Sequence, residues 1–257
     1  MPELPDLEVF SHNLNKKLSG KTVHQVTVHT SKANVSEKEL QQTLHGQKLS
    51  AVYREGKELH FEFSKRDVLA MHLMLHGKLY YFEKKNEQKY PVIELLFNDD
   101  TGLVLTDFQK AATPTLNPEK KDAPDALSAE ADKDYLKGVL AKKRTNIKTI
   151  LLDQKIIRGI GNAYVDEILW QARISPFSAG NKIPADKVKE LISSIHSVLK
   201  DAQKNIIKHN PDIIAGEVRD FMLIHNPKNK TSPEGAKIQV ENGSRKTYYT
   251  DEQELYK

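Results

Sequence analysis

The sequence contains no cysteine in its 257 residues. Disulfide bonds, thiolate nucleophiles and every zinc site built on cysteine are therefore excluded. Long apolar runs are also missing, because no stretch approaches the roughly 20 consecutive apolar residues that a membrane-spanning helix needs. The first residues lack the basic and then apolar order of a signal peptide. We therefore expect a cytoplasmic protein that does not contact membranes.

The composition is that of an ordinary folded protein, with 38% hydrophobic and 29% charged residues. This composition excludes a collagen-like, coiled-coil or disordered chain. The net charge of +4 is unevenly placed: residues 1–115 carry 15 basic and 15 acidic side chains, whereas residues 135–257 carry 21 and 14. Basic side chains that neutralise phosphates release counterions, so this distribution slightly favours a phosphate-rich partner over a merely solvated surface.

The first half of the chain has the pattern of a helix followed by an antiparallel β-sandwich. Pro5 suits the first turn of a helix, Asp6 and Glu8 complement its dipole, and Gly20 suits its end. Alternating or apolar segments then predict strands. They cover residues 22–30, 47–53, 58–63, 67–83, 91–98 and 103–107.

The second half predicts a helical domain that ends in a small hairpin. Apolar residues recur at helical spacing from residue 147 to residue 199, and Asn242-Gly243 is a strong hairpin signal between two short strand-like stretches. The fold class is therefore α+β. Four segments are predicted: a sandwich domain at 1–115, an acidic linker at 116–134, a helical domain at 135–225 and a hairpin at 226–257.

The N-terminus offers a nucleophile. Pro2 is small enough for Met1 to be removed, which would leave a secondary amine that titrates near 7.7–8.0 rather than near the roughly 10.4 of lysine. Glu3 beside it could move protons to and from the same substrate. The alternative is that Glu3 only complements the dipole of the following helix.

A glycine-bearing turn in the second half predicts a phosphate-binding site. Gly159 and Gly161 allow close approach of a ligand to the backbone, and Asn162 begins the next helix, where free N–H groups bind anions. The alternative is tight packing between two helices. Basic residues surround the turn and favour DNA-backbone binding: Lys142, Lys143, Arg144, Lys148, Lys155 and Arg158.

Five landmarks together resemble the formamidopyrimidine-DNA glycosylase and endonuclease VIII family. They occur in the family's order over nearly the whole chain, at residues 2–5, 56–57, 72–77, 158–162 and 245–249. The resemblance implies a sandwich domain that carries the catalytic N-terminus. It also implies a helix-two-turns-helix domain and a C-terminal finger.

The resemblance implies a base-excision-repair enzyme that flips a damaged nucleotide out of double-stranded DNA. Pro2 would attack the sugar C1′ and form a Schiff base, with Glu3 and Lys57 assisting. β,δ-Elimination would then cut the backbone, as an abasic-site lyase does. Arg245 would act from the finger, and the remaining DNA contacts would come from Leu75, Gln109, Lys155, Gly161 and Asn162.

Three departures from the family pattern are visible in the sequence. The positions of the family's zinc-binding cysteines hold Thr231, Glu234, Thr250 and Gln253, so we expect a zincless finger held by cross-strand contacts around Tyr248 and Tyr249. We expect neither a metal nor a cofactor.

In the family, a Met, an Arg and a Phe fill the space that the flipped nucleotide leaves in the duplex. Their positions here hold Leu75, Gln109 and Ala111, so Leu75 together with Gln109 or Phe108 would fill that space. Residues 213–221 are too few for the long capping loop of members that recognise 8-oxoguanine. The preferred lesion therefore stays open between oxidised pyrimidines, formamidopyrimidines, hydantoins and abasic sites.

Two other functions remain compatible with the sequence. One is a non-catalytic protein that has the same fold and binds damaged DNA. The other is an RNA-binding protein that contacts the nucleic-acid backbone through the two helices joined by the glycine-bearing turn. The presence of Pro2, Glu3 and Lys57 favours the enzyme, which we expect to act as a monomer.

Overall fold

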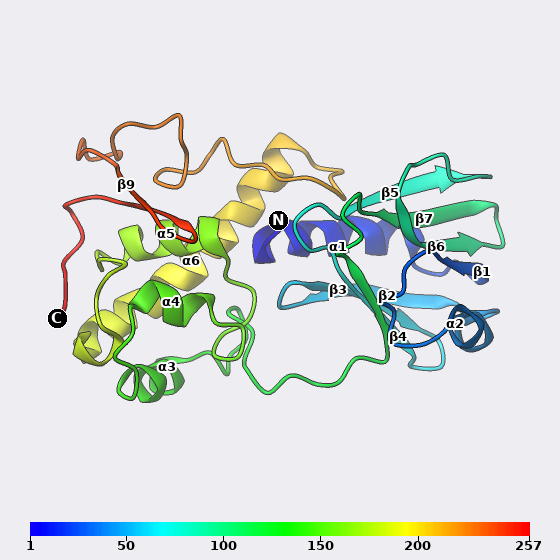
Figure 1. Cartoon of the computed structure of the whole chain (residues 1–257), viewed down its shortest axis with the longest axis horizontal. Coiled ribbons are helices and arrows are strands. Elements are labelled where there is room, and N and C mark those ends of the chain that lie inside the picture. Colours follow the sequence, from blue (N-terminus) through cyan, green and yellow to red (C-terminus); the bar gives the residue numbers. More distant parts are fainter. The chain divides into compact units, whose positions relative to one another are not determined.

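The computed structural model describes residues 1–257, which divide into two compact units (Figure 1). The first unit comprises Met1–Lys120 and Ile206–Glu217, and the second comprises Lys121–Asn205 and Val218–Lys257. None of the helices is long and apolar enough to cross a lipid bilayer.

The first unit begins with helix α1 (Leu4–Leu18), as the sequence predicts. Glu3 is its N-cap residue, and the Asp6 carboxylate accepts a hydrogen bond of 2.8 Å from the backbone N–H of Glu3. The apolar face of the helix, including Phe10 and Leu14, is fully buried. Burial of this face fixes the start of the chain in the unit's core.

Two four-stranded antiparallel sheets form the predicted sandwich. The first has the order β1-β6-β7-β5 and comprises β1 (Val23–Val28), β6 (Pro91–Phe97), β7 (Thr101–Thr106) and β5 (Lys78–Glu83). The second has the order β2-β3-β4-β8 and comprises β2 (Leu49–Glu55), β3 (Glu58–Phe63), β4 (Val68–His72) and β8 (Thr113–Leu116). Apolar side chains from both sheets are buried, among them Phe61, Phe63, Leu95 and Leu103.

The first unit differs from the sequence prediction in three elements. Helix α2 (Glu37–Leu44) was not predicted, because only Leu40 and Leu44 of it are buried and two residues make no periodic pattern. Strand β8 was missed because it contains Pro114, which strands accommodate mainly at a sheet edge. The segment predicted as one strand at residues 67–83 forms β4 and β5, separated by a turn at residues 73–77.

The second unit is helical, as predicted. Its helices are α3 (Lys133–Leu140), α4 (Ile147–Leu152), α5 (Asn162–Gln171), a short 3₁₀ helix (Gly180–Lys182) and α6 (Ala185–His209), the last four residues of which group with the first unit. Its apolar core includes Leu151, Val165, Ile168 and Leu191.

Most of the segment predicted as an acidic linker at residues 116–134 belongs to the second unit, which begins at Lys121. The Arg158 backbone N–H donates to the Pro124 carbonyl, and the Ala126 N–H donates to the Arg158 carbonyl, both at 2.9 Å. Ala126 is fully buried. The turn before α5 therefore has a neighbouring segment that braces it.

The C-terminal hairpin is formed by β9 (Gln239–Asn242) and β10 (Lys246–Tyr249). Asn242 pairs with Lys246, so three residues, Gly243, Ser244 and Arg245, make the connection. Arg245 is therefore the last residue of the hairpin tip, and it is exposed to solvent.

Candidate functional site

The proposed nucleophile and proton carrier lie at the start of α1. Pro2 is buried, and the Glu3 side chain is only 4% exposed. The Met1 ammonium group pairs with the Glu217 carboxylate, which belongs to the same unit. While Met1 is attached, the Pro2 nitrogen is an amide without nucleophilic character.

Lys57 lies in the two-residue turn between β2 and β3, where Glu55 pairs with Glu58. Gly56 has a φ of 57°, the left-handed conformation that such tight hairpin turns require. Lys57 itself is half-buried. The backbone conformation of the turn therefore fixes the base of the Lys57 side chain.

Arg54 connects this turn to α1, a contact that sequence reasoning missed. Its Nε donates to the Glu8 carboxylate at 2.7 Å, and its Nη1 donates to the Gly56 carbonyl at 3.1 Å. The Arg54 side chain is only 6% exposed. The helix that follows Pro2 and Glu3 therefore also holds the Lys57 turn, so three of the four predicted catalytic residues are connected through α1, and the fourth, Arg245, belongs to the second unit.

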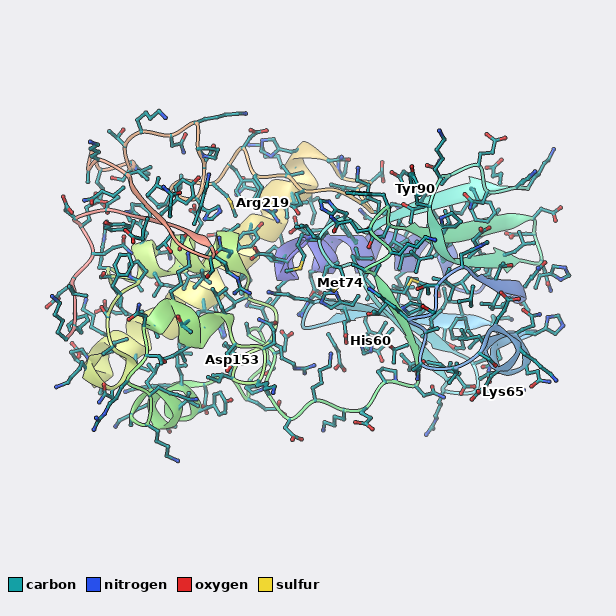
Figure 2. All side chains as sticks on the ribbon, viewed as in Figure 1. His60, Lys65, Met74, Tyr90, Asp153 and Arg219 are labelled. Carbon is teal, nitrogen blue, oxygen red and sulfur yellow. The ribbon has the colours of Figure 1, made fainter.

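Two turns of the first unit expose apolar side chains. Met74, labelled in Figure 2, and Leu75 lie between β4 and β5, with 37% and 58% of their surfaces exposed. Phe108 follows β7 and is also 58% exposed, and its ring lies 4.6 Å from the His76 ring. The two turns therefore meet through an aromatic contact.

Asp107 shapes the turn that carries Phe108 and Gln109. Its buried carboxylate accepts the backbone N–H groups of Gln109, Ala111 and Ala112 at 3.0, 2.7 and 2.8 Å. Gln109 and Phe108 are held outward by this turn, and both are exposed. An Asp that precedes a non-periodic stretch is a recognisable signal for such a turn.

In the second unit, the predicted glycine-bearing turn joins α4 to α5. Gly159 has a φ of 104°, and Gly161 is the N-cap residue of α5. Lys155 is exposed in this turn. The arrangement matches the predicted helix-two-turns-helix motif, with the N-terminus of α5 at its end.

The hairpin tip is tied to this motif by Asn162, the first residue of α5. Its Nδ2 donates a hydrogen bond of 3.0 Å to the carbonyl of Lys246, which follows Arg245. A cavity of about 630 Å³ lies between α4 and the tip, and its lining includes Lys148, Thr149, Asp153 (Figure 2) and Arg245. The structure therefore brings Arg245 and Asn162 together within one unit.

Lys148 differs from its predicted role as a surface cation around the turn. Its side chain is almost completely buried, and its Nζ lies 2.7 Å from the Asp166 carboxylate. The same Nζ donates to the Lys246 carbonyl at 3.0 Å and to the Thr247 hydroxyl at 2.9 Å. Lys148 therefore anchors β10 rather than facing solvent.

Glu167 is a second acidic residue of α5 that sequence reasoning missed. Its carboxylate accepts the backbone N–H groups of Leu223, Ile224 and His225 at 3.1, 2.8 and 2.7 Å. Burial raises the pKa of Glu167, and these hydrogen bonds oppose the increase. Glu167 therefore fixes the segment that leads into the hairpin.

The residues at the four finger positions without cysteine make other contacts. Gln253 accepts the Thr250 backbone N–H at 2.9 Å and donates to the Ile174 carbonyl at 2.9 Å. Glu234 pairs with Arg173, and Thr231 forms a backbone bridge to Lys237. The finger is therefore closed by hydrogen bonds.

Comparison with known families agrees with this geometry. The formamidopyrimidine-DNA glycosylase N-terminal domain matches residues 1–113, and the H2TH domain of the same family matches residues 123–210. This chain belongs to the formamidopyrimidine-DNA glycosylase family. The family predicted from the five landmarks is confirmed.

Relatives in this family include the formamidopyrimidine-DNA glycosylase of Lactobacillus gasseri. It is 33% identical over 215 residues, which cover 79% of this chain and 78% of the relative. The enzyme of Carboxydothermus hydrogenoformans is 35% identical over 209 residues, covering 77% and 76%. The protein is accordingly a DNA glycosylase of base-excision repair.

Two solved structures of the Lactococcus lactis formamidopyrimidine-DNA glycosylase share the fold. One is a complex with DNA that contains an abasic site, with a TM-score of 0.88 and 25% identity. The other is a complex with DNA that contains an oxidised pyrimidine, with a TM-score of 0.88 and 26% identity. Each comparison covers 98% of this chain and the whole of the other.

Proposed function

We propose that the protein removes oxidised bases from double-stranded DNA through the amine of Pro2 and then cleaves the backbone. The observation that carries this proposal is the placement of Pro2 and Glu3 at the buried start of α1, with the Lys57 turn tied to the same helix through Arg54 and Glu8. An amine and a carboxylic acid side by side are the groups that this chemistry needs.

The chemistry begins when the Pro2 nitrogen attacks the sugar C1′ and the damaged base leaves with a proton. Glu3 protonates the ring oxygen, the sugar opens, and an iminium joins Pro2 to C1′. The iminium makes the C2′ proton acidic, so its removal expels the 3′ phosphate. A second elimination expels the 5′ phosphate, and hydrolysis of the remaining adduct returns the free amine.

The hydrogen bond from the Glu3 backbone to Asp6 holds the residue next to the nucleophile in one conformation. Lys57 approaches the phosphate of the damaged nucleotide from its fixed turn. Removal of Met1 is required, because only then does Pro2 carry a free amine.

The second unit holds the DNA backbone. Its phosphate contacts are Lys155, the amide groups at Gly161 and Asn162, and Arg245 at the hairpin tip. Leu75, with Phe108 or Gln109, occupies the space left by the extruded nucleotide, since all three side chains are exposed. We place the protein in the cytoplasm, as a monomer on chromosomal DNA.

The decisive experiment is borohydride trapping of protein that mass spectrometry shows to lack Met1. Duplexes would contain an abasic site, dihydrothymine or 8-oxoguanine, and peptide mapping would locate the adduct. We expect a covalent link at Pro2, and the yields would rank the lesions. Pro2→Gly is the matched variant, which should bind the same duplexes without forming the proline adduct.

The alternative functions predict other results. Binding of damaged duplexes without any adduct would support a non-catalytic protein that binds damaged DNA. Equal competition by duplex RNA at fixed salt would support an RNA-binding protein, because backbone contacts alone depend strongly on ionic strength.

A further inference from the structure

The Glu252 carboxylate is the centre of a hydrogen-bonded cluster at the closed end of the finger. Its Oε2 accepts a hydrogen bond from the Trp170 indole at 2.7 Å and one from the Thr250 hydroxyl at 2.7 Å. Its Oε1 accepts one from the Ser232 hydroxyl at 2.9 Å. Arg173 lies 3.5 Å away, and the Glu252 side chain is only 15% exposed.

These donors come from three separate segments of the second unit. Ser232 precedes β9, Thr250 follows β10, and Trp170 belongs to the last turn of α5. One carboxylate therefore joins both arms of the hairpin to the helix whose N-terminus faces the hairpin tip. A tetrahedral metal site makes the same kind of connection between segments.

Arg173 gives independent support for this cluster. It follows α5 with a φ of 57°, the left-handed conformation that usually selects glycine after a helix. A residue with a Cβ is unfavourable in that conformation unless its contacts compensate. The guanidinium pairs with Glu234, faces Glu252 and lies 4.9 Å above the Trp170 ring.

We propose that Glu252 is a positioning residue that holds the finger, and with it Arg245, in the DNA-binding conformation without a metal. The inference rests on the proposed function in one respect, namely that Arg245 contacts DNA. It predicts that duplex binding is insensitive to chelators and depends on the charge of Glu252.

Charge at this site is favoured by its surroundings. Burial by itself raises the pKa of Glu252, but the hydrogen bonds from Trp170, Thr250 and Ser232, together with Arg173, outweigh burial and lower the pKa below its ordinary value. Two further acidic groups of the finger have partners of their own: Glu234 pairs with Arg173, and Asp251 accepts a hydrogen bond from Gln239.

The test compares Glu252→Gln with Asp251→Asn, which removes a negative charge one residue away. Trp170 is the only tryptophan, so its fluorescence reports on the cluster directly. For Glu252→Gln we expect a changed Trp170 emission and roughly tenfold weaker binding of an undamaged duplex, because charge-assisted hydrogen bonds are lost. At saturating abasic DNA, kcat should stay within about twofold while KM rises.

A milder variant tests the same cluster in case Glu252→Gln fails to fold. Ser232→Ala removes one hydrogen bond to Glu252, and we expect an intermediate loss of duplex affinity at an almost unchanged melting temperature. Asp251→Asn should match the parent in both fluorescence and affinity.

The inference is overturned if Glu252→Gln binds the undamaged duplex as tightly as the parent, or if EDTA weakens binding by the parent. These readouts need no base excision, so they are separate from the proposed chemistry. Failure to trap Pro2 alongside weaker binding by Glu252→Gln would reject the mechanism and support the role of Glu252.

Discussion

The Lys148 ammonium lies 2.7 Å from the Asp166 carboxylate, and the two side chains are 9% and 0% exposed. Asp166 also accepts the Tyr248 backbone N–H at 3.0 Å and contacts the His225 ring at 2.7 Å. This ion pair therefore links α4, α5 and the hairpin. Removal of one partner would leave a buried charge without its counterion.

Replacement of Lys148 by Met should consequently destabilise the protein by about 3–5 kcal/mol, because the Asp166 charge stays buried without its partner. The free energy of unfolding in urea would measure this. Lys155→Met is the control, since Lys155 is exposed: its stability should match the parent while its affinity for duplex DNA falls. Parent-like stability of Lys148→Met would contradict the assigned anchoring role.

The protein should become less stable at acidic pH, because protonation of Glu252 removes its charge. Because the pKa of Glu252 in the folded protein lies below the ordinary glutamate value, its carboxylate stabilises the fold above that ordinary value, and this contribution disappears as the pH falls through the lowered pKa. Melting temperatures measured between pH 6 and pH 3 should therefore fall more steeply for the parent than for Glu252→Gln. Parallel curves would argue against the lowered pKa.

Arg54→Met should slow catalysis without abolishing it. The substitution keeps an extended side chain but removes the contacts to Glu8 and to the Gly56 carbonyl. We expect a decrease on the order of tenfold in the single-turnover rate of abasic-site cleavage, because the Lys57 turn loses its support. Glu8→Gln removes the charge of the partner and should give a smaller decrease. An unchanged rate in both variants would show that the turn needs no such support.

Phe108→Ala should reduce excision from duplex DNA more than cleavage of an abasic site. An exposed apolar side chain can enter a base step and stabilise the extruded nucleotide, a step that matters less where no base is paired. Ile207→Ala removes a comparably exposed side chain and is the control. Equal losses on both substrates would indicate a general folding defect, which the melting temperature would reveal.

Much of the architecture could be predicted from local sequence signals. The helix after Pro2, the alternating strands and the hairpin at residues 239–249 follow from patterns that span only a few neighbouring residues. Elements with weak local patterns were missed: α2 has two buried apolar residues, and β8 contains a proline.

The sequence by itself determined the family, the α+β class and the absence of cysteine ligands in the finger. Only the tertiary structure decided which charged residues are structural. Lys148 bonds to a carbonyl 98 positions along the chain, and Glu252 bonds to an indole 82 positions away. A surface lysine and a buried one have the same local pattern, and their difference arises from burial and partner distance, which only the folded chain defines.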